Sequence, residues 1–202
     1  TLFRSIGLFF GSFNPPHIGH ALIAIRAKEQ FQLDKVYFIV SPQNPFKEES
    51  LLAPINVRYN FVKTLCSELG PDFLTSDVEF HLPKPSYTSV TLKWITSDEN
   101  PENQQQKNEY CIIMGMDCLD SIGSWKDNEY IRKNFQILVY NRLGDYVIPT
   151  ELLFEYPIGL IDAPILELSS TEIRERIKNG TSVKYLIPDS VLFEINITGS
   201  YR

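Results

Sequence analysis

Four short apolar segments, spread along the 202-residue chain, limit the folds open to it. They are residues 5–10, 35–40, 110–114 and 135–140. Runs of this length that are apolar throughout, rather than at every second position, are typical of strands buried on both faces of a parallel sheet. Parallel strands need crossover connections, and the segments between them contain good helix formers. The sequence therefore predicts an α/β fold, a doubly wound parallel sheet with helices on both faces.

Shorter elements complete the expected order. Residues 73–76 and 158–161 have the composition of two further strands. Helices are expected from about residue 21 to 29 and over 54–69, 88–96, 171–179 and 188–195, with Pro54 starting the second and Gly70 ending it. Residues 97–108 are polar and without periodicity, which predicts an exposed loop. The chain length suits one domain with a full-sized core.

Composition excludes several classes of protein. The net charge of -6 argues against a general nucleic-acid binder, which needs a basic face. No apolar run approaches membrane-spanning length, and the N-terminus lacks the pattern of a signal peptide. The three cysteines are odd in number and not at zinc spacing, so reduced structural thiols in a cytoplasmic protein are the simplest interpretation.

A strand-to-helix turn at residues 11–20 follows the first apolar segment. Gly11 lacks a Cβ, so a ligand can approach the backbone there. His17 and His20 are three residues apart and therefore share a face of the first helical turn. The free amides and the positive end of the helix dipole at this place suit a phosphate. Two imidazoles aimed at the same position extend this to a polyphosphate site.

The two histidines also have other interpretations. One histidine near a helix start is usually just a polar surface residue, but the chain has only three, and two of them occur here while His81 is distant. Histidine is also a common zinc ligand. Because no third or fourth ligand stands at metal spacing, zinc ranks below phosphate, and no metal site made by the protein is predicted.

A second polar helix start lies near the C-terminus, at residues 169–174, Ser-Ser-Thr-Glu-Ile-Arg. Ser169 followed by Glu172 can simply form a capping box. The same hydroxyls and free amides can instead bind phosphate oxygens, and Arg174, one turn into the helix, would add a charge-assisted pair of hydrogen bonds. The residues alone leave both interpretations open.

Both segments resemble motifs of one family. Gly-Ser-Phe-Asn-Pro-Pro-His-Ile-Gly-His at 11–20 resembles the (T/H)xGH signature of the nucleotidyltransferase superfamily, more narrowly of the nicotinate (nicotinamide) mononucleotide adenylyltransferases. Residues 168–174 resemble the family's second signature, (I/V)SSTx(I/V)R, with Leu168 in place of Ile or Val. The tail is similar to that of the bacterial nicotinate-nucleotide adenylyltransferases. Class I aminoacyl-tRNA synthetases share the literal His-Ile-Gly-His, but they are much longer and carry a Lys-Met-Ser-Lys-Ser-type motif that this sequence lacks.

The resemblance implies two sets of site residues. For ATP they are Gly11, Ser12, Phe13, His17, Gly19, His20, Ser169, Ser170 and Arg174, with His17 and His20 as the catalytic pair. For nicotinate mononucleotide they are Ser12, Phe13, Asn14, Lys47, Tyr87, Thr88, Gly115, Asp117, Trp125 and Arg142. In this picture the nicotinate ring stacks on Trp125, backbone amides near Tyr87 and Thr88 bind its carboxylate, and Asp117 meets a ribose hydroxyl.

The resemblance also implies the fold and the reaction. It implies a Rossmann-like sheet of nucleotidyltransferase type, with residues 1–202 as a single domain whose C-terminal part, about 168–202, completes the ATP site. The implied reaction of NAD biosynthesis joins ATP and nicotinate mononucleotide into nicotinate adenine dinucleotide and releases pyrophosphate, with Mg²⁺ carried on the ATP phosphates. The alternatives are a phosphopantetheine-type adenylyltransferase and a non-catalytic nucleotide-sensing module. The sequence leaves open the preference for the acid or the amide mononucleotide, and the oligomeric state.

Overall fold

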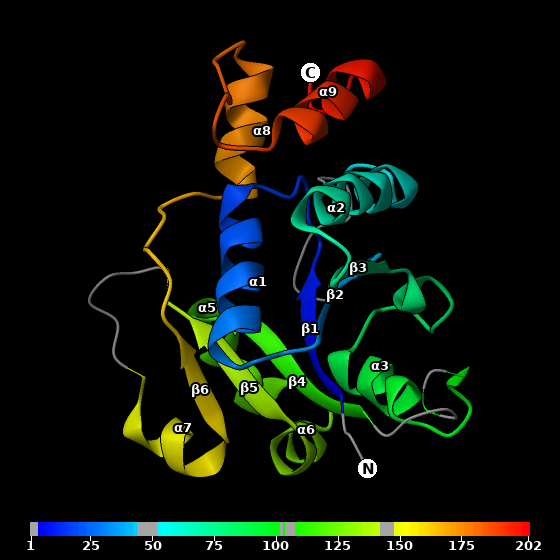
Figure 1. Cartoon of the computed structure of the whole chain (residues 1–202), viewed down its shortest axis with the longest axis vertical. Helices are drawn as coiled ribbons and strands as arrows, with labels where there is room; N and C mark the ends of the chain where they lie inside the picture. The colour runs from blue at the N-terminus through cyan, green and yellow to red at the C-terminus, as the bar shows by residue number, and fades with distance from the viewer. Residues whose placement is uncertain (1–3, 44–51, 102, 104–107, 142–147) are drawn as a thin grey trace.

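A computed structural model describes residues 4–43, 52–101, 103, 108–141 and 148–202. A six-stranded sheet forms its centre, in the order β3-β2-β1-β4-β5-β6, and each neighbouring pair of strands is parallel (Figure 1). The strands are β1 (Arg4–Gly11), β2 (Lys35–Val40), β3 (Phe73–Ser76), β4 (Asn108–Gly115), β5 (Gln136–Tyr140) and β6 (Ile158–Ile161). This is the order of doubly wound dinucleotide-binding sheets, which reverses between β1 and β4 and opens a crevice at their carboxyl ends. The predicted Rossmann-like sheet is confirmed.

The helices expected from the sequence are present, with ends within three residues of the predicted ones. They are α1 (Ile18–Gln30), α2 (Ile55–Leu69), α3 (Thr88–Ile95), α8 (Ser170–Lys178) and α9 (Asp189–Thr198). Three further helices were missed, α5 (Met116–Leu119), α6 (Asn128–Asn134) and α7 (Thr150–Glu155), because each is too short to show a helical period. Two 3₁₀ turns, η2 (Val78–Phe80) and η3 (Ile122–Ser124), were missed as well. Among the described helices, none has both the length and the apolar character needed to cross a membrane.

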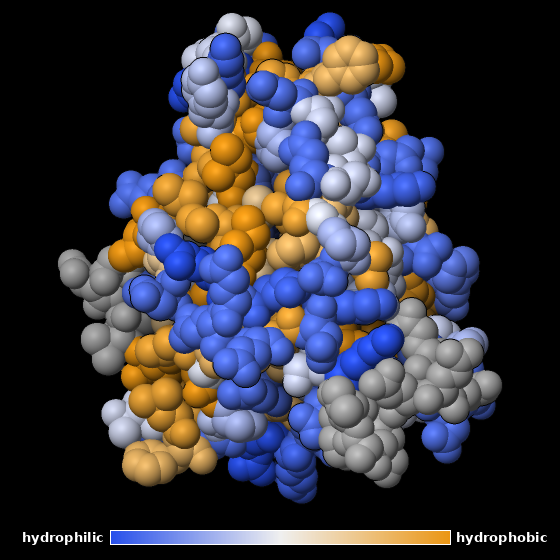
Figure 2. All heavy atoms as spheres, in the orientation of Figure 1, coloured by the Kyte–Doolittle hydropathy of each residue, from blue (hydrophilic) through white to orange (hydrophobic). Residues whose placement is uncertain are grey.

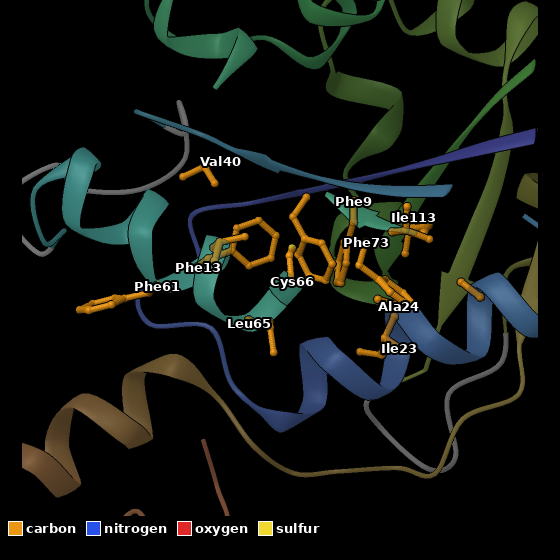
Figure 3. Packing of buried hydrophobic residues seen from close by; sticks show 14 of the residues in the cluster. Phe9, Phe13, Ile23, Ala24, Val40, Phe61, Leu65, Cys66, Phe73 and Ile113 are labelled. Carbon is orange, nitrogen blue, oxygen red and sulfur yellow. The ribbon is translucent and has the colours of Figure 1, made fainter. Parts of the chain in front are cut away.

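Two apolar layers, one on each face of the sheet, form the core. Phe9 of β1 points into the layer covered by α1, α2, α8 and α9, where its ring lies near that of Phe13 (Figure 3). The preceding residue, Leu8, belongs to the opposite layer with side chains of α3, α5 and α6. Adjacent residues of a strand point to opposite faces, so both sides of β1 are buried. This explains why the strand is apolar throughout.

The C-terminal helices stack at one end of the molecule, beyond α1 and α2 (Figure 1). Val191 and Ile195 of α9 are buried against this layer, whereas Phe193 and Ile197 of the same helix face outward. Figure 2 shows hydrophobic atoms over α9 at the top and over α7 at the lower left. The helix α9 thus contributes only one narrow side to the core.

The interpretation of residues 97–108 as an exposed loop is wrong in part. Asn100 is only 5% exposed, and its amide group donates to the Ile95 carbonyl over 2.8 Å. The amide of Asn103 donates to the Ser97 carbonyl over 3.0 Å. Both asparagines close the end of α3, because Ile95 is its last residue and the Ile95 carbonyl accepts from both amide groups.

Cys66 and Cys111 form no disulfide within the described residues, in line with the reduced thiols that the sequence predicts. Cys66 and Cys111 are buried in the layer under α1 and α2. Burial raises the pKa of the Cys66 thiol to about 11 and that of Cys111 to about 12. Both thiols therefore stay protonated at neutral pH and act as small apolar groups.

Candidate active site

A cavity of about 720 Å³ lies at the carboxyl ends of the strands, where the strand order reverses. This volume is within the range of small-molecule binding sites. The predicted residues that line it are Gly11, Ser12, Phe13, Asn14, His17, His20, Tyr87, Thr88, Gly115, Asp117, Trp125, Ser169, Ser170 and Arg174. Lys47 and Arg142 lie outside the described residues. Among the residues that the structure describes, polar segments that are distant in sequence thus meet at one edge of the sheet.

Gly11 is closely approached by the side chain of Phe13. Phe13 has a φ of 44° and turns its ring back over β1. A Cβ on Gly11 would lie 2.8 Å from that ring. Phe13 is only 2% exposed and packs edge-on to His20, with 5.1 Å between ring centroids. The glycine therefore makes room for a core residue that supports one of the two histidines.

The two histidines form a joined pair at the start of α1. His17 is the N-cap, and its backbone N–H donates to Nδ1 of His20 over 3.1 Å. The ring centroids are 3.8 Å apart, and the side chains are 2% and 8% exposed, respectively. Because Nδ1 of His20 accepts a hydrogen bond, the neutral ring carries its proton on Nε2. His20 can thus donate from Nε2, as a phosphate ligand must.

Unlike the other described residues that were predicted for the site, Gly19 does not contribute to the described lining of the cavity. It is buried inside α1. A Cβ at this position would come within 3.0 Å of the His17 ring. Its absence lets that ring lie against the helix, so Gly19 acts on the site through His17.

The second motif reaches the first through direct hydrogen bonds. Nη1 of Arg174 donates to the Asn14 carbonyl over 2.9 Å, and the Ser170 hydroxyl donates to the Pro15 carbonyl over 2.9 Å. Ser169 caps α8, since its Oγ accepts from the backbone N–H of Glu172 over 3.1 Å. The Ser169 half of the predicted capping box is therefore present. It does not exclude ligand binding, because Ser169, Ser170 and Arg174 also line the cavity.

The chain beyond α8 is tied to the same turn. The backbone N–H of Ile18 donates to the Leu186 carbonyl over 3.0 Å, and the Tyr201 hydroxyl donates to Oδ1 of Asn14 over 2.8 Å. Burial raises the pKa of Tyr201 well above its usual value, so this hydroxyl remains a donor at neutral pH. Oδ1 of Asn14 also accepts from the backbone of Ala53 over 3.0 Å. Asn14 thus joins three parts of the chain beside the cavity.

Arg58 was missed by the sequence analysis. It is 1% exposed, in the first turn of α2, and its guanidinium donates to four backbone carbonyls. The acceptors are Ser12 at 2.7 Å, Ser41 at 2.9 Å, Ala53 at 2.9 Å and Pro42 at 3.2 Å. Burial lowers the pKa of Arg58, and Tyr201 raises it in part. The one local signal was a cation in the first turn of a helix, where the dipole disfavours it.

Glu79 is a second buried ionisable residue that the sequence did not single out. It lies in η2, is 2% exposed, and accepts from the Thr91 hydroxyl over 2.8 Å. Burial raises the pKa of its carboxyl, and the hydroxyls of Ser41, Thr91 and Ser86 partly oppose this. Ser41 and Ser86 line the cavity, so Glu79 stands directly behind its wall.

The far end of the cavity is formed by α3, α5 and the segment after η3. Tyr87 is the N-cap of α3, and Trp125 follows η3 with its indole N–H donating to the Ser121 hydroxyl over 3.2 Å. At the start of α5, a Cβ on Gly115 would lie only 2.4 Å from Oδ1 of Asp117. Glycine at this position therefore lets the Asp117 carboxylate fold back beside the end of β4.

The described residues contain no group of three or more His, Cys, Asp or Glu side chains placed to hold a metal ion. The histidine, acidic and basic side chains that line the described cavity are His17, His20, Asp117, Lys126 and Arg174. A divalent cation would thus find few ligands from these residues, and its coordination would come mainly from substrate phosphates and water.

Comparisons with known proteins agree with this arrangement. The model of the cytidylyltransferase-like family matches residues 8–176. Proteins named "Probable nicotinate-nucleotide adenylyltransferase" from Flavobacterium psychrophilum and Cytophaga hutchinsonii are each 41% identical to the chain, over 197 and 187 residues. These alignments cover 98% of each chain for the first protein and 92% of each for the second. The Bacteroides fragilis protein of the same name is 40% identical over 185 residues, which are 92% of this chain and 88% of that one.

Solved structures show the same fold at lower identity. The nicotinic acid mononucleotide adenylyltransferase of Plasmodium falciparum, complexed with NaAD, matches with a TM-score of 0.79 at 18% identity, over 98% of this chain and 97% of that one. The same enzyme complexed with APC matches with a TM-score of 0.78, also at 18% identity and with the same coverage. Since the family match and the bacterial relatives span nearly the whole sequence, the chain belongs to the nicotinate-nucleotide adenylyltransferases within the cytidylyltransferase-like family.

Proposed function

We propose that this chain transfers the adenylyl group of ATP to nicotinate mononucleotide, forming nicotinate adenine dinucleotide and pyrophosphate. One observation carries the proposal. The turn that holds His17 and His20 is hydrogen-bonded to the turn that holds Ser170 and Arg174, although some 150 residues separate them in sequence, and both line one cavity. A polyphosphate placed between them would meet donors from both sides.

The reaction needs no covalent intermediate on the protein. A phosphate oxygen of the mononucleotide attacks the α-phosphorus of ATP in line with the leaving group and forms a new P–O bond. The bond from the α-phosphorus to the bridging oxygen breaks, and pyrophosphate leaves with that electron pair. Catalysis of such a displacement depends on positioning the two substrates and on stabilising the charge on the bridging and leaving oxygens.

The histidine pair is proposed to act on the ATP phosphates. His20 donates from Nε2 to an α-phosphate oxygen, and its orientation is fixed by the N–H of His17 on Nδ1. His17 contacts the adjacent phosphate, and the backbone amides of Ser12 and Phe13 lie between the two substrates. Bound Mg²⁺ would supply further positive charge on the phosphate oxygens, held there chiefly by the substrate and water.

The start of α8 is proposed to hold the β- and γ-phosphates. Its free backbone amides and helix dipole favour negative charge. The hydroxyls of Ser169 and Ser170 add donors, and the guanidinium of Arg174 keeps N–H groups beyond the ones it gives to Asn14 and Thr171. In this proposal residues 168–202 complete the ATP site of a single domain.

The mononucleotide is proposed to bind at the far end of the cavity. There the Trp125 indole offers a face for the pyridine ring, the amides at the start of α3 face the carboxylate, and Asp117 accepts from a ribose hydroxyl. Lys47 and Arg142 stay predicted contacts of the mononucleotide. We place the reaction in the cytoplasm, in keeping with the free thiols of Cys66 and Cys111.

Pyrophosphate release by the purified protein tests the proposal. The protein is incubated with ATP and Mg²⁺, together with nicotinate mononucleotide, nicotinamide mononucleotide or phosphopantetheine. We expect the fastest release with nicotinate mononucleotide and formation of the matching dinucleotide. Turnover with phosphopantetheine alone would support the first alternative, and nucleotide binding without any turnover would support a sensing module.

A further inference from the structure

We propose that the side chain of Lys126 determines the preference for the acid form of the mononucleotide. Its ammonium group would pair with the carboxylate of the pyridine ring, which the nicotinamide form lacks. This inference rests on the proposed function and specifies the substrate selectivity of the same site.

The ammonium group of Lys126 lies at the end of the cavity that is proposed to bind the pyridine ring. Lys126 lines the cavity directly after Trp125, the residue proposed to stack on the pyridine ring. Its Nζ lies 4.7 Å from the centroid of the Tyr87 ring, within the range of a cation–π contact. Because Tyr87 is the N-cap of α3, this contact places Nζ beside the helix start that is proposed to receive the carboxylate.

The nearest carboxylate in sequence is already engaged by another lysine. Asp127 accepts from Nζ of Lys93 over 2.6 Å, and this hydrogen bond is the main reason that the pKa of Asp127 is lowered, while the charge of Lys126 adds a smaller effect. Within the described part of the chain, no carboxylate lies within 4.0 Å of Lys126 Nζ. A ligand carboxylate is therefore a suitable partner for this ammonium group.

The other polar groups at this place are also donors. The first-turn amides of α3 point toward the helix start, as those of any helix do. The Ser89 hydroxyl is 1% exposed, lines the cavity, and has no hydrogen-bond partner among the described residues. A carboxylate can accept from all of these donors, whereas a carboxamide offers one acceptor and turns an NH₂ group toward them. The donor set therefore selects against the amide as well as for the acid.

The positions of the cationic side chains in the cavity agree with separate places for the ATP phosphates and for the pyridine ring. Lys126 and Arg174 are the lysine and arginine of the described lining. Arg174 belongs to α8 and is hydrogen-bonded to Asn14, at the end proposed for the ATP phosphates. Among the described residues, Lys126 is thus the cation available to the pyridine end.

Equilibrium binding tests the inference without relying on turnover. The dissociation constants of nicotinate mononucleotide and nicotinamide mononucleotide are measured by calorimetry on the wild type, Lys126→Gln, Lys126→Arg and Lys133→Gln. Lys133 is the matched control, an exposed lysine paired with Glu129 on the surface of α6. For Lys126→Gln we expect the dissociation constant of the acid to rise about tenfold, equivalent to about 1.4 kcal/mol, while that of the amide changes little. Lys126→Arg should retain the preference, and added salt should weaken it.

Three results would overturn the inference. They are equal binding of both mononucleotides by the wild type, binding of neither, and a Lys126→Gln variant that keeps the wild-type ratio between the two ligands. The proposed function is judged separately by pyrophosphate release. A wild type that binds the acid through Lys126 but turns nothing over would refute the proposed reaction and leave the role of Lys126 intact.

Discussion

Replacing Arg58 by methionine should destabilise the protein and loosen the substrate site together. The guanidinium joins the segments that follow β1 and β2, since it donates to carbonyls of Ser12 and Ser41, and it also reaches Pro42 and Ala53. Methionine keeps most of the buried apolar stem and removes every one of these donors. The substitution therefore isolates the hydrogen bonds from the packing.

The size of the effect follows from the four acceptors left behind. A buried acceptor that loses its partner costs roughly 1–3 kcal/mol. Ser12 and Ser41 line the cavity, so water can hydrogen-bond to their carbonyls and offset part of the lost stability. The remaining two acceptors then cost about 4 kcal/mol together. Removal of a desolvated cation returns some of this, which leaves a net loss of about 3 kcal/mol in the free energy of unfolding.

Urea denaturation and thermal unfolding measure this loss. For a chain of this size, about 3 kcal/mol corresponds to a decrease of roughly 6–12 °C in Tm. The control is Arg176→Met, because Arg176 pairs with Glu172 over 3.7 Å at the surface and should contribute about 1 kcal/mol or less. If Arg58→Met unfolds within about 1 kcal/mol of the wild type, the inference that Arg58 holds these two segments is wrong. The stability of Arg58→Lys should lie between that of the wild type and that of Arg58→Met.

Further predictions concern the phosphate ligands and the buried carboxyl. His20→Ala should lower kcat by about a hundredfold or more at unchanged circular dichroism, because a preorganised donor to the α-phosphate is lost; near-normal pyrophosphate release would remove His20 from the mechanism. Arg174→Ala should raise the apparent KM for ATP about tenfold, and an unchanged value would contradict its role. Since burial raises the pKa of Glu79, its ionisation costs stability as the pH rises above the ordinary carboxyl range near about 4.3. Glu79→Gln should therefore exceed the wild type in Tm at pH 7 and match it at low pH; a pH-independent difference would refute this.

Local sequence was enough to predict the strands and the principal helices. The segments that became β1, β2, β4 and β5 are apolar throughout because both faces of each strand are covered. The helix starts at His17 and Ser169 were visible because caps and free amides depend on a few consecutive residues. Short helices such as α5 and α6 gave no such signal, since fewer than two turns show no periodicity.

The buried polar groups that support the cavity were beyond sequence reasoning. Arg58 and Glu79 look like ordinary surface residues in the sequence, and only the packing of α2 and η2 shows that they are desolvated behind the cavity wall. Lys126 was not predicted either, because its significance depends on Tyr87 and on the pairing of Lys93 with Asp127.

By itself, then, the amino-acid sequence determined the type of sheet, the family and the two polar turns proposed to bind phosphate, because each of these depends on residues that are neighbours in the chain. The tertiary structure decided that the turns meet, through Arg174 on Asn14 and Ser170 on Pro15. It also decided which ionisable side chains are buried and which face the cavity. Burial and charge pairing arise from groups far apart in sequence, and they take effect only when folding removes those groups from water.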